Sequence, residues 1–306
     1  AAPLVGPDRA LLMSDTRDPL RDLPFTKMTG SGNDFVVFDG REVPTALLTR
    51  PEVIRAICHR HNGIGADGVV LLEPGVGEDA PIRLRYFNRD GTLGELCGNA
   101  TLCSTALSVR SGLAPATAVR LQTDAGLVSA RQPGGGDPEI DIAPVLDIRP
   151  DLSALGLPTP PNATHVGFAL VGVPHVVIVL PDAAALSAVP VVASGRPIRQ
   201  HASLQPAGAN VNWVAPDGLG GWSYRTYERG VEDETLACGT GAIACAILLS
   251  RWGLASAPIT LHTRSGRPVT VSFRDSATGA GAILPSLRGE GRVVFRGQIG
   301  ALPIEA

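Results

Sequence analysis

The chain has 306 residues, a formal net charge of −3 and 44% hydrophobic residues, which suits two domains with aliphatic cores. The basic residues are scattered along the chain, and this excludes a strongly basic nucleic-acid-binding face. No apolar run approaches the roughly 18 residues that a membrane span requires. We therefore expect neither nucleic acid nor membrane among the partners.

Cysteine and lysine usage restricts the possible chemistry. The five cysteines include no Cys-x-x-Cys pair, which favours a reducing, cytoplasmic location over a disulfide framework. Of 26 basic residues only Lys27 is a lysine, so lysine-linked pyridoxal phosphate has one possible anchor.

A zinc site is the first alternative use of the cysteines. It would recruit Cys97 with Cys103, six residues apart, and Cys238 with Cys245, seven residues apart. On a helix the second pair is roughly 10 Å apart, which is too far for one metal. We therefore expect no metal, and we interpret Cys58, Cys103 and Cys245 as small buried residues.

The predicted elements occur in the same order in both halves. Residues 1–22 are charged and interrupted by proline, and we expect a flexible leader without the apolar stretch of a secretory signal. Predicted helices follow Cys97 and Cys238 and end at Gly112 and Gly253. Short β-rich runs precede each helix, at 35–38, 69–72 and 82–87, and at 166–171, 176–180, 211–214 and 223–227.

Aligning Cys97 with Cys238 supports a duplication. The offset of 141 residues superposes Gly98 on Gly239, Leu107 on Leu248, Arg110 on Arg251 and 112–114 on 253–255, and after a one-residue gap Leu121, Thr123 and Gly126 fall on Leu261, Thr263 and Gly266. Two related lobes, each with a cysteine at an equivalent place, are therefore expected. The proline- and glycine-rich stretches at 134–138 and 150–161 predict the linker between them.

Each of these cysteines is predicted to lie at a helix N-terminus. Free N–H groups and the helix dipole lower a thiol pKa there, and the same groups can hold a carboxylate. Two such thiols on facing lobes suit inversion of a stereocentre, in which a thiolate removes a proton and a thiol delivers one to the opposite face. Three asparagines in loops beside strands are candidates to orient a substrate: Asn33, Asn88 and Asn212.

The sequence resembles the diaminopimelate epimerase family over nearly its whole length after residue 22. The segments that carry the resemblance are 25–35 (FTKMTGSGNDF), 63–68 (GIGADG), 88–91 leading to Cys97-Gly98-Asn99, 210–212 (NVN), 228–230 (ERG) and 234–241 (ETLACGTG).

The resemblance implies an α+β fold of two pseudo-symmetric lobes, each a mostly antiparallel barrel-like sheet around a central helix. It implies an N-terminal lobe over 23–145 with a returning C-terminal strand in 288–306 (about 293–299), a C-terminal lobe over 146–287, a homodimer and no cofactor. It makes Cys97 and Cys238 the acid/base pair. N–H groups for the reacting carboxylate come from Gly98, Asn99, Gly239 and Thr240, and the remote amino-acid end is held by Asn33, Asn88, Asn212, Glu228 and Arg229.

Three departures from the family pattern affect the expected substrate pocket. Leu102 stands where the family usually has arginine, and Val173 replaces the asparagine of Gly-Asn-Pro-His. The segment Val231-Glu232-Asp233 has one residue more than the commonest spacing. His175, next in that motif, is interpreted equally as a buttress or a proton carrier.

The function expected from the sequence is cofactor-independent interconversion of LL- and meso-diaminopimelate, a small amino-acid substrate of lysine and cell-wall precursor synthesis. One alternative is a racemase of the same fold for another amino acid, of the histidine or hydroxyproline type. Glu228 and Arg229 argue against a substrate without a far amino-acid end. The other alternative is a thiol redox or binding protein, which the two Cys-Gly-(Asn/Thr) motifs disfavour.

Overall fold

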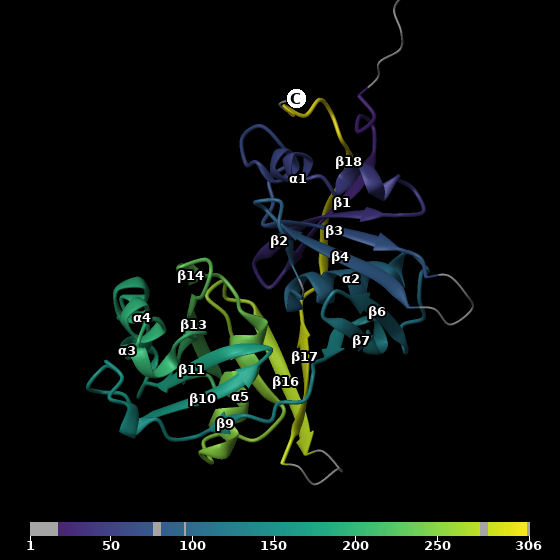
Figure 1. Cartoon of the computed structure of the whole chain (residues 1–306). Coiled ribbons are helices and arrows are strands. Elements are labelled where there is room, and N and C mark those ends of the chain that lie inside the picture. The colour runs from purple at the N-terminus through teal and green to yellow at the C-terminus, as the bar shows by residue number, and fades with distance from the viewer. Residues whose placement is uncertain (1–17, 76–80, 95, 276–280, 305–306) are drawn as a thin grey trace, which may run out of the picture.

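The computed structural model describes residues 18–75, 81–94, 96–275 and 281–304, and these form two lobes, with the chain running from β17 at the lobe junction to β18 in the first lobe (Figure 1). The first lobe is one curved sheet with the spatial order β18-β1-β2-β3-β4-β6-β7-β8, and β5 pairs beside β4. Its strands are β1 (Pro24–Gly30), β2 (Asn33–Asp39), β3 (Gly68–Glu73), β4 (Ile82–Asn88), β5 (Leu93–Gly94), β6 (Val119–Thr123), β7 (Gly126–Arg131), β8 (Glu139–Asp141) and β18 (Arg292–Gln298).

The second lobe repeats this arrangement with the order β9-β10-β11-β12-β13-β15-β16-β17, and β14 pairs beside β13. Its strands are β9 (Ile148–Arg149), β10 (His165–Val171), β11 (Val173–Val179), β12 (Asn210–Pro216), β13 (Trp222–Glu228), β14 (Asp233–Thr235), β15 (Ile259–His262), β16 (Pro268–Asp275) and β17 (Ile283–Gly289). In each lobe two pairings are parallel, β2–β3 and β4–β6 in the first and β11–β12 and β13–β15 in the second.

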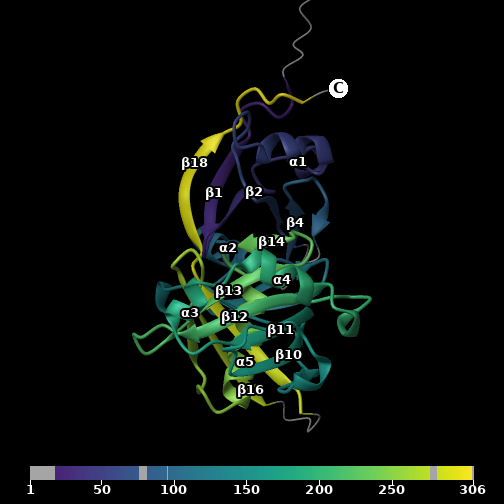
Figure 2. The ribbon, with the colours of Figure 1, turned by 90° about the vertical axis from the view of Figure 1, so that its left-hand side faces the viewer.

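The lobes are joined where β17 pairs antiparallel with β8, and β18 then returns to the first lobe and pairs antiparallel with β1. In the turned view β18 lies at the edge of its sheet beside β1 (Figure 2). The chain passes between the lobes within residues 142–147, between β8 and β9. We retain 23–145 with 288–306, and 146–287, as the proposed division into domains.

A central helix fills each curved sheet, α2 (Gly98–Arg110) in the first lobe and α5 (Gly239–Arg251) in the second. Ten consecutive residues of α2, from Asn99 to Ser108, are buried, as expected of a helix that is surrounded rather than laid on a surface. Both helices are followed by a glycine at φ 71°, Gly112 and Gly253, where a left-handed residue ends the helix without steric cost. Helices α2 and α5 have the same length and start 141 residues apart, which confirms the predicted duplication.

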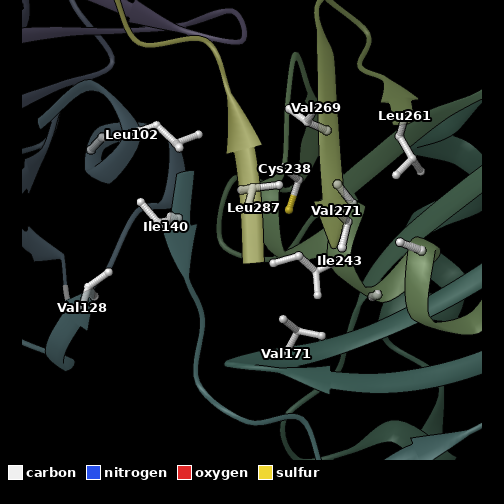
Figure 3. Packing of buried hydrophobic residues seen from close by; sticks show 14 of the residues in the cluster. Leu102, Val128, Ile140, Val171, Cys238, Ile243, Leu261, Val269, Val271 and Leu287 are labelled. Carbon is white, nitrogen blue, oxygen red and sulfur yellow. The ribbon is translucent and has the colours of Figure 1, made fainter. Parts of the chain in front are cut away.

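Side chains from both helices and from β17 form one continuous apolar core. Figure 3 shows Leu102 and Ile140 on one side of β17, and Cys238, Ile243 and Val271 on the other, with Leu287 between them. Leu287 therefore packs at the junction of the lobes, close to the second cysteine.

The outer faces of the sheets carry separate small cores. Helix α1 (Pro51–Cys58) covers the first lobe, and α3 (Ala183–Ser187) and α4 (Val191–Arg199) cover the second. Short 3₁₀ turns lie at Thr45–Leu48, Pro133–Gly135, Ser153–Leu155 and Ala202–Leu204. None of the helices in the described ranges is long and apolar enough to cross a membrane.

The linker predicted at 134–138 is wrong. This segment joins β7 to β8 within the first lobe, because Arg131 pairs with Glu139 across it and Gly134 and Gly135 take positive φ angles. Glycine and proline mark tight turns as well as linkers. Residues 150–161 follow β9 and lie within the second lobe.

The predicted leader lies mostly outside the described residues, which begin at 18. Its last part packs on the first lobe: Leu20 is 1% exposed in the outer core. Asp22 also donates its N–H to the carbonyl of Ile299.

Candidate active site

The two cysteines that the sequence singles out occupy equivalent places. Cys97 is the N-cap of α2 (φ −128°, ψ 115°) and Cys238 the N-cap of α5 (φ −135°, ψ 104°). An extended N-cap residue leaves the first N–H groups of its helix pointing outward without helical partners. Each thiol therefore lies beside free N–H donors, as predicted.

The N-termini of the two helices face each other across the lobe junction. A Cβ built on Gly239 would lie 4.0 Å from the Cα of Gly98 and 4.0 Å from Oδ1 of Asn99. A substituent at either glycine would enter the space between the helix ends. The side chain of Leu287 borders this space, with its Cδ2 2.9 Å from the Cβ built on Gly239. The lack of a Cβ at the two glycines leaves room there for a small anion to approach the N–H groups.

Burial decides the protonation of both thiols. Cys97 is partly buried and Cys238 is 6% exposed. Desolvation raises the pKa of Cys97 to about 11, against the lowering effect of the backbone N–H groups of Ala100 and Asn99. Desolvation likewise raises the pKa of Cys238 to about 12. The expected net lowering of thiol pKa by the helix ends is therefore wrong for the free protein, because loss of hydration outweighs the N–H donors.

Glu228, the last residue of β13, lies near both thiols. Its charge contributes to the raised pKa of Cys97 and of Cys238. Burial raises the pKa of the Glu228 carboxyl itself, partly offset by the Thr235 hydroxyl. Asn88 ends β4 at the matching place in the first lobe, and its Nδ2 donates to the hydroxyl of Thr92 at 3.0 Å.

Two predicted amides in the first lobe contact each other. Nδ2 of Asn99 donates to Oδ1 of Asn33 at 2.7 Å, and Nδ2 of Asn33 faces Oδ2 of Asp67 at 3.2 Å. Oδ1 of Asn99 is buried without a partner among the described residues. Since it faces Gly239 across the junction, this acceptor is available to a donor placed between the helices.

Asn212 is buried and engaged internally. Its Nδ2 donates to the carbonyl of Val176 at 3.0 Å and lies 3.2 Å from Nδ1 of His175, while its Oδ1 accepts from the Thr226 hydroxyl at 2.8 Å. Burial lowers the pKa of His175 to about 3, with a smaller contribution from the charge of Arg229. A neutral imidazole in contact with Asn212 favours the interpretation of His175 as a buttress, while its Nε2 is buried without a partner among the described residues.

Arg229 follows Glu228 and is held by its surroundings. Its N–H donates to Oδ1 of Asn210 at 2.7 Å and its Nη1 donates to the carbonyl of Ala207 at 2.9 Å. Within the described part of the chain no carboxylate forms an ion pair with it. The rest of its guanidinium is thus open to an external anion.

Thr240 and Gly241 complete the second helix end. The Thr240 hydroxyl lies 3.6 Å from Sγ of Cys238. A Cβ on Gly241 would lie 3.2 Å from the same sulfur and would collide with Oδ1 of Asn212. The thiol, the helix start and Asn212 are therefore closely packed.

Two of the three family departures have structural explanations. Leu102 is fully buried in the central core beside β17 (Figure 3), so it contributes packing at that position. The longer loop is anchored through Glu232, at φ 58°, whose carboxylate accepts from Tyr227 at 2.8 Å and from Arg199 at 3.0 Å. Val173 starts β11 next to the β10–β11 turn.

The other residues with reactive side chains, Lys27 and three cysteines, lie away from the two helix N-termini or in the hydrophobic cores. The ammonium of Lys27 pairs with Asp34 at 2.7 Å and donates to the carbonyl of Gly65. Cys58, Cys103 and Cys245 are 5%, 0% and 0% exposed, which confirms them as small buried residues.

Sequence reasoning missed Asp67 and Tyr224. Tyr224 contacts the backbone of Cys238 from β13, and no local pattern signals such a long-range contact.

These features define a class of two-lobed proteins with an N-cap cysteine on each central helix. Among solved structures, a phenazine biosynthesis protein of the PhzF family from Bacillus anthracis has a TM-score of 0.70 at 12% identity, covering 91% of this chain and 99% of its own. A probable proline racemase from Agrobacterium radiobacter has a TM-score of 0.66 at 19% identity, covering 92% and 94%. These likenesses confirm the predicted fold class.

Sequence comparison identifies the family. The family model described as diaminopimelate epimerase matches residues 25–137 and 167–281. A diaminopimelate epimerase from Gemmatimonas aurantiaca is 53% identical over 285 residues, which is 92% of this chain and all of that protein. One from Aquifex aeolicus is 36% identical over 262 residues, covering 83% and 91%. The chain belongs to the diaminopimelate epimerase family, which confirms the resemblance.

Proposed function

We propose that this protein interconverts LL- and meso-diaminopimelate, with Cys97 and Cys238 as the acid/base pair and with no cofactor. The observation that carries the proposal is the facing pair of helix N-termini, each with a cysteine at its N-cap. Diaminopimelate epimerase relatives over nearly the whole chain support this substrate.

In the proposed reaction one cysteine is a thiolate and the other a thiol. The thiolate takes the α-proton, so the C–H bond breaks and its electron pair is delocalised into the adjacent carboxylate. The opposite thiol then gives its proton to the other face of the same carbon and becomes the thiolate. The two sulfurs exchange protonation states, and no redox partner is needed.

The weak acidity of an amino-acid α-proton requires stabilisation of the enediolate-like transition state. We assign this role to the backbone N–H groups of Gly98, Asn99, Gly239 and Thr240, because preorganised donors in a dry site stabilise developing negative charge. The positively charged α-ammonium group of the substrate would also offset the negative charge of Glu228 near the thiols. The raised thiol pKa values fit a site that holds its protons until a substrate arrives.

We assign the remote amino-acid end to Arg229 and Glu228, with the amides of Asn33, Asn88 and Asn212. Arg229 is pre-positioned by two hydrogen bonds, from its backbone N–H to Oδ1 of Asn210 and from its Nη1 to the carbonyl of Ala207, and a guanidinium binds a carboxylate through two parallel hydrogen bonds. The Nδ2 group of Asn212 is engaged by Val176 and His175 in the free protein, so donation to substrate requires exchange of one internal hydrogen bond. Its Oδ1 accepts only from Thr226 and has a second lone pair for a substrate donor.

A panel of amino-acid stereoisomers incubated with purified protein tests this function. We expect turnover of LL- and meso-diaminopimelate and none of proline, 4-hydroxyproline or histidine. Preferential turnover of one of those three would contradict the assignment of Glu228 and Arg229 to a far amino-acid end. Loss of activity on chelation or on removal of pyridoxal phosphate would contradict the cofactor-independent chemistry.

We further propose a homodimer and a reducing, cytoplasmic location. The homodimer is supported by β18, which pairs with β1 and exposes Val294 and Phe295 (48% and 47%) at a sheet edge (Figure 2). The location is supported by five free cysteines.

Size-exclusion chromatography with light scattering tests the dimer. Val294→Lys is expected to shift the mass toward that of the monomer. Leu219→Lys, at a residue 89% exposed on the β12–β13 turn, is the control and should leave the mass unchanged. A wild-type monomer mass would contradict the homodimer, and cell fractionation tests the location.

A further inference from the structure

The hydroxyl of Tyr224 holds the backbone of Cys238 on both sides. The N–H of Cys238 donates to Oη of Tyr224 at 3.2 Å, and the Tyr224 O–H donates to the carbonyl of Cys238 at 2.9 Å. Tyr224 is 2% exposed and lies in the central core between the sheet and α5. Its main chain is fixed in β13 by pairing with Val214 of β12.

The first lobe satisfies the same carbonyl in a different way. The carbonyl of Cys97 accepts from the N–H of Thr101 at 2.9 Å and from the Thr101 hydroxyl at 2.8 Å. Thr101 belongs to the helix that Cys97 begins, and the matching residue of α5 is Ala242, which has no hydroxyl. The matching strand residue for Tyr224 is Leu84, since Ile82 pairs with Leu121 as Trp222 pairs with Leu261.

The source of the hydroxyl has therefore changed between the lobes. In the first lobe it comes from within the helix, so it moves with Cys97. In the second lobe it comes from a strand, and it ties the N-cap residue to β13. Glu228 lies on the same strand, four residues after Tyr224, so this tie also fixes the thiol relative to the Glu228 carboxyl.

We propose that Tyr224 is a positioning residue that holds the Cys238 thiol in register with β13 and Glu228. Its part in catalysis rests on the proposed function, in which Cys238 exchanges a proton with substrate. Its effect on the thiol does not, because the contacts exist in the free protein. Without the hydroxyl, the buried N–H of Cys238 has no acceptor and its carbonyl loses a donor, so the N-cap residue can leave its extended conformation.

Tyr224→Phe removes only the hydroxyl and keeps the ring in the core. The matched control is Tyr227→Phe, which removes a buried hydroxyl three residues along β13 that bonds Glu232 instead. Iodoacetamide labelling of the substrate-free proteins over a range of pH, quantified for each cysteine by mass spectrometry, reports both thiols at once. Cys97 serves as the internal reference.

In Tyr224→Phe, we expect the Cys238 rate relative to the Cys97 rate to rise about fivefold or more, because a released thiol is more exposed. The pH profile of Cys238 should shift while that of Cys97 stays unchanged. The ratio in Tyr227→Phe should equal that of the wild type. Misplacement of a catalytic group by about 1 Å can cost roughly 100-fold in rate, so kcat of Tyr224→Phe should fall about 10- to 100-fold with KM changed less than about threefold.

A general loss of stability would change both cysteine rates together, and this result would overturn the positioning role. An unchanged ratio in Tyr224→Phe would overturn it as well. Failure of the proposed function is seen separately, as epimerisation by Cys238→Ala or as absence of diaminopimelate turnover by the wild type. Neither of those results bears on the labelling ratio, which is measured in the proteins that retain both cysteines.

Discussion

Gly241 is the position where one added methyl group tests the packing of the site most severely. In a helix, alanine is preferred to glycine by about 1 kcal/mol, and the matching residue of α2 is Ala100. At Gly241, however, the new Cβ would collide with Oδ1 of Asn212 and lie 3.2 Å from Sγ of Cys238. Asn212 cannot withdraw freely, because it is fully buried and bonded to Val176, His175 and Thr226.

The expected outcome for Gly241→Ala is therefore destabilisation. Loss of one or two Asn212 hydrogen bonds costs about 1 kcal/mol each, and overpacking costs about 1–3 kcal/mol. After the gain of about 1 kcal/mol from the helix preference for alanine is subtracted, the free energy of unfolding falls by roughly 2 kcal/mol, which lowers Tm by about 4 °C.

Thermal unfolding followed by circular dichroism measures this loss. Gly98→Ala is the matched control, since its Cβ would meet only Leu287 at 3.6 Å, and its Tm should stay within about 1 °C. A Gly241→Ala variant as stable as the wild type would refute the argument that Asn212 is held rigidly against α5.

Three further outcomes are expected. Arg229→Ala should lower kcat/KM for diaminopimelate by about 100-fold, since the far carboxylate loses its bidentate partner, and near-normal turnover would favour racemases of smaller amino acids. Because burial raises the pKa of Cys97 to about 11 and of Cys238 to about 12 from 9.0, the folded state keeps both protons where the unfolded chain loses them. The free energy of unfolding should thus fall as pH rises above about 9, and it should fall less steeply when both cysteines are replaced by alanine. Equal slopes against pH in the wild type and the double variant would contradict this. Oxidants should inactivate through a Cys97–Cys238 disulfide that reductant reverses, and mass spectrometry finding both cysteines unmodified in oxidised, inactive protein would exclude it.

The repeated part of the fold was predictable because its signals are local. Gly112 and Gly253 end their helices where the pattern places them, and the offset between Cys97 and Cys238 is the offset between α2 and α5. The outer helices were missed for different reasons. Helix α4 contains Gly195 and Pro197, which indicate a loop, whereas α1 begins with Pro51 and buries Val53, Ile54 and Ile57, a spacing typical of a helix.

The site was predictable in its residues and less so in its electrostatics. A helix N-terminus predicts a lower thiol pKa, but the opposing desolvation depends on the packing of both lobes around Cys97 and Cys238. Tyr224 and Asp67 reach the site through contacts between distant segments. Such contacts follow from strand register, which a residue pattern alone does not determine.

The exchange of hydrogen at the inverted carbon tests the two-cysteine mechanism most directly. In D₂O, product should carry solvent deuterium at that carbon, and substrate recovered early should carry little, because different thiols remove and deliver the proton. Cys97→Ala and Cys238→Ala should each stop epimerisation, since each lacks the acceptor in one direction and the donor in the other. Equal early labelling of substrate and product, or substantial epimerisation by either alanine variant, would contradict the account.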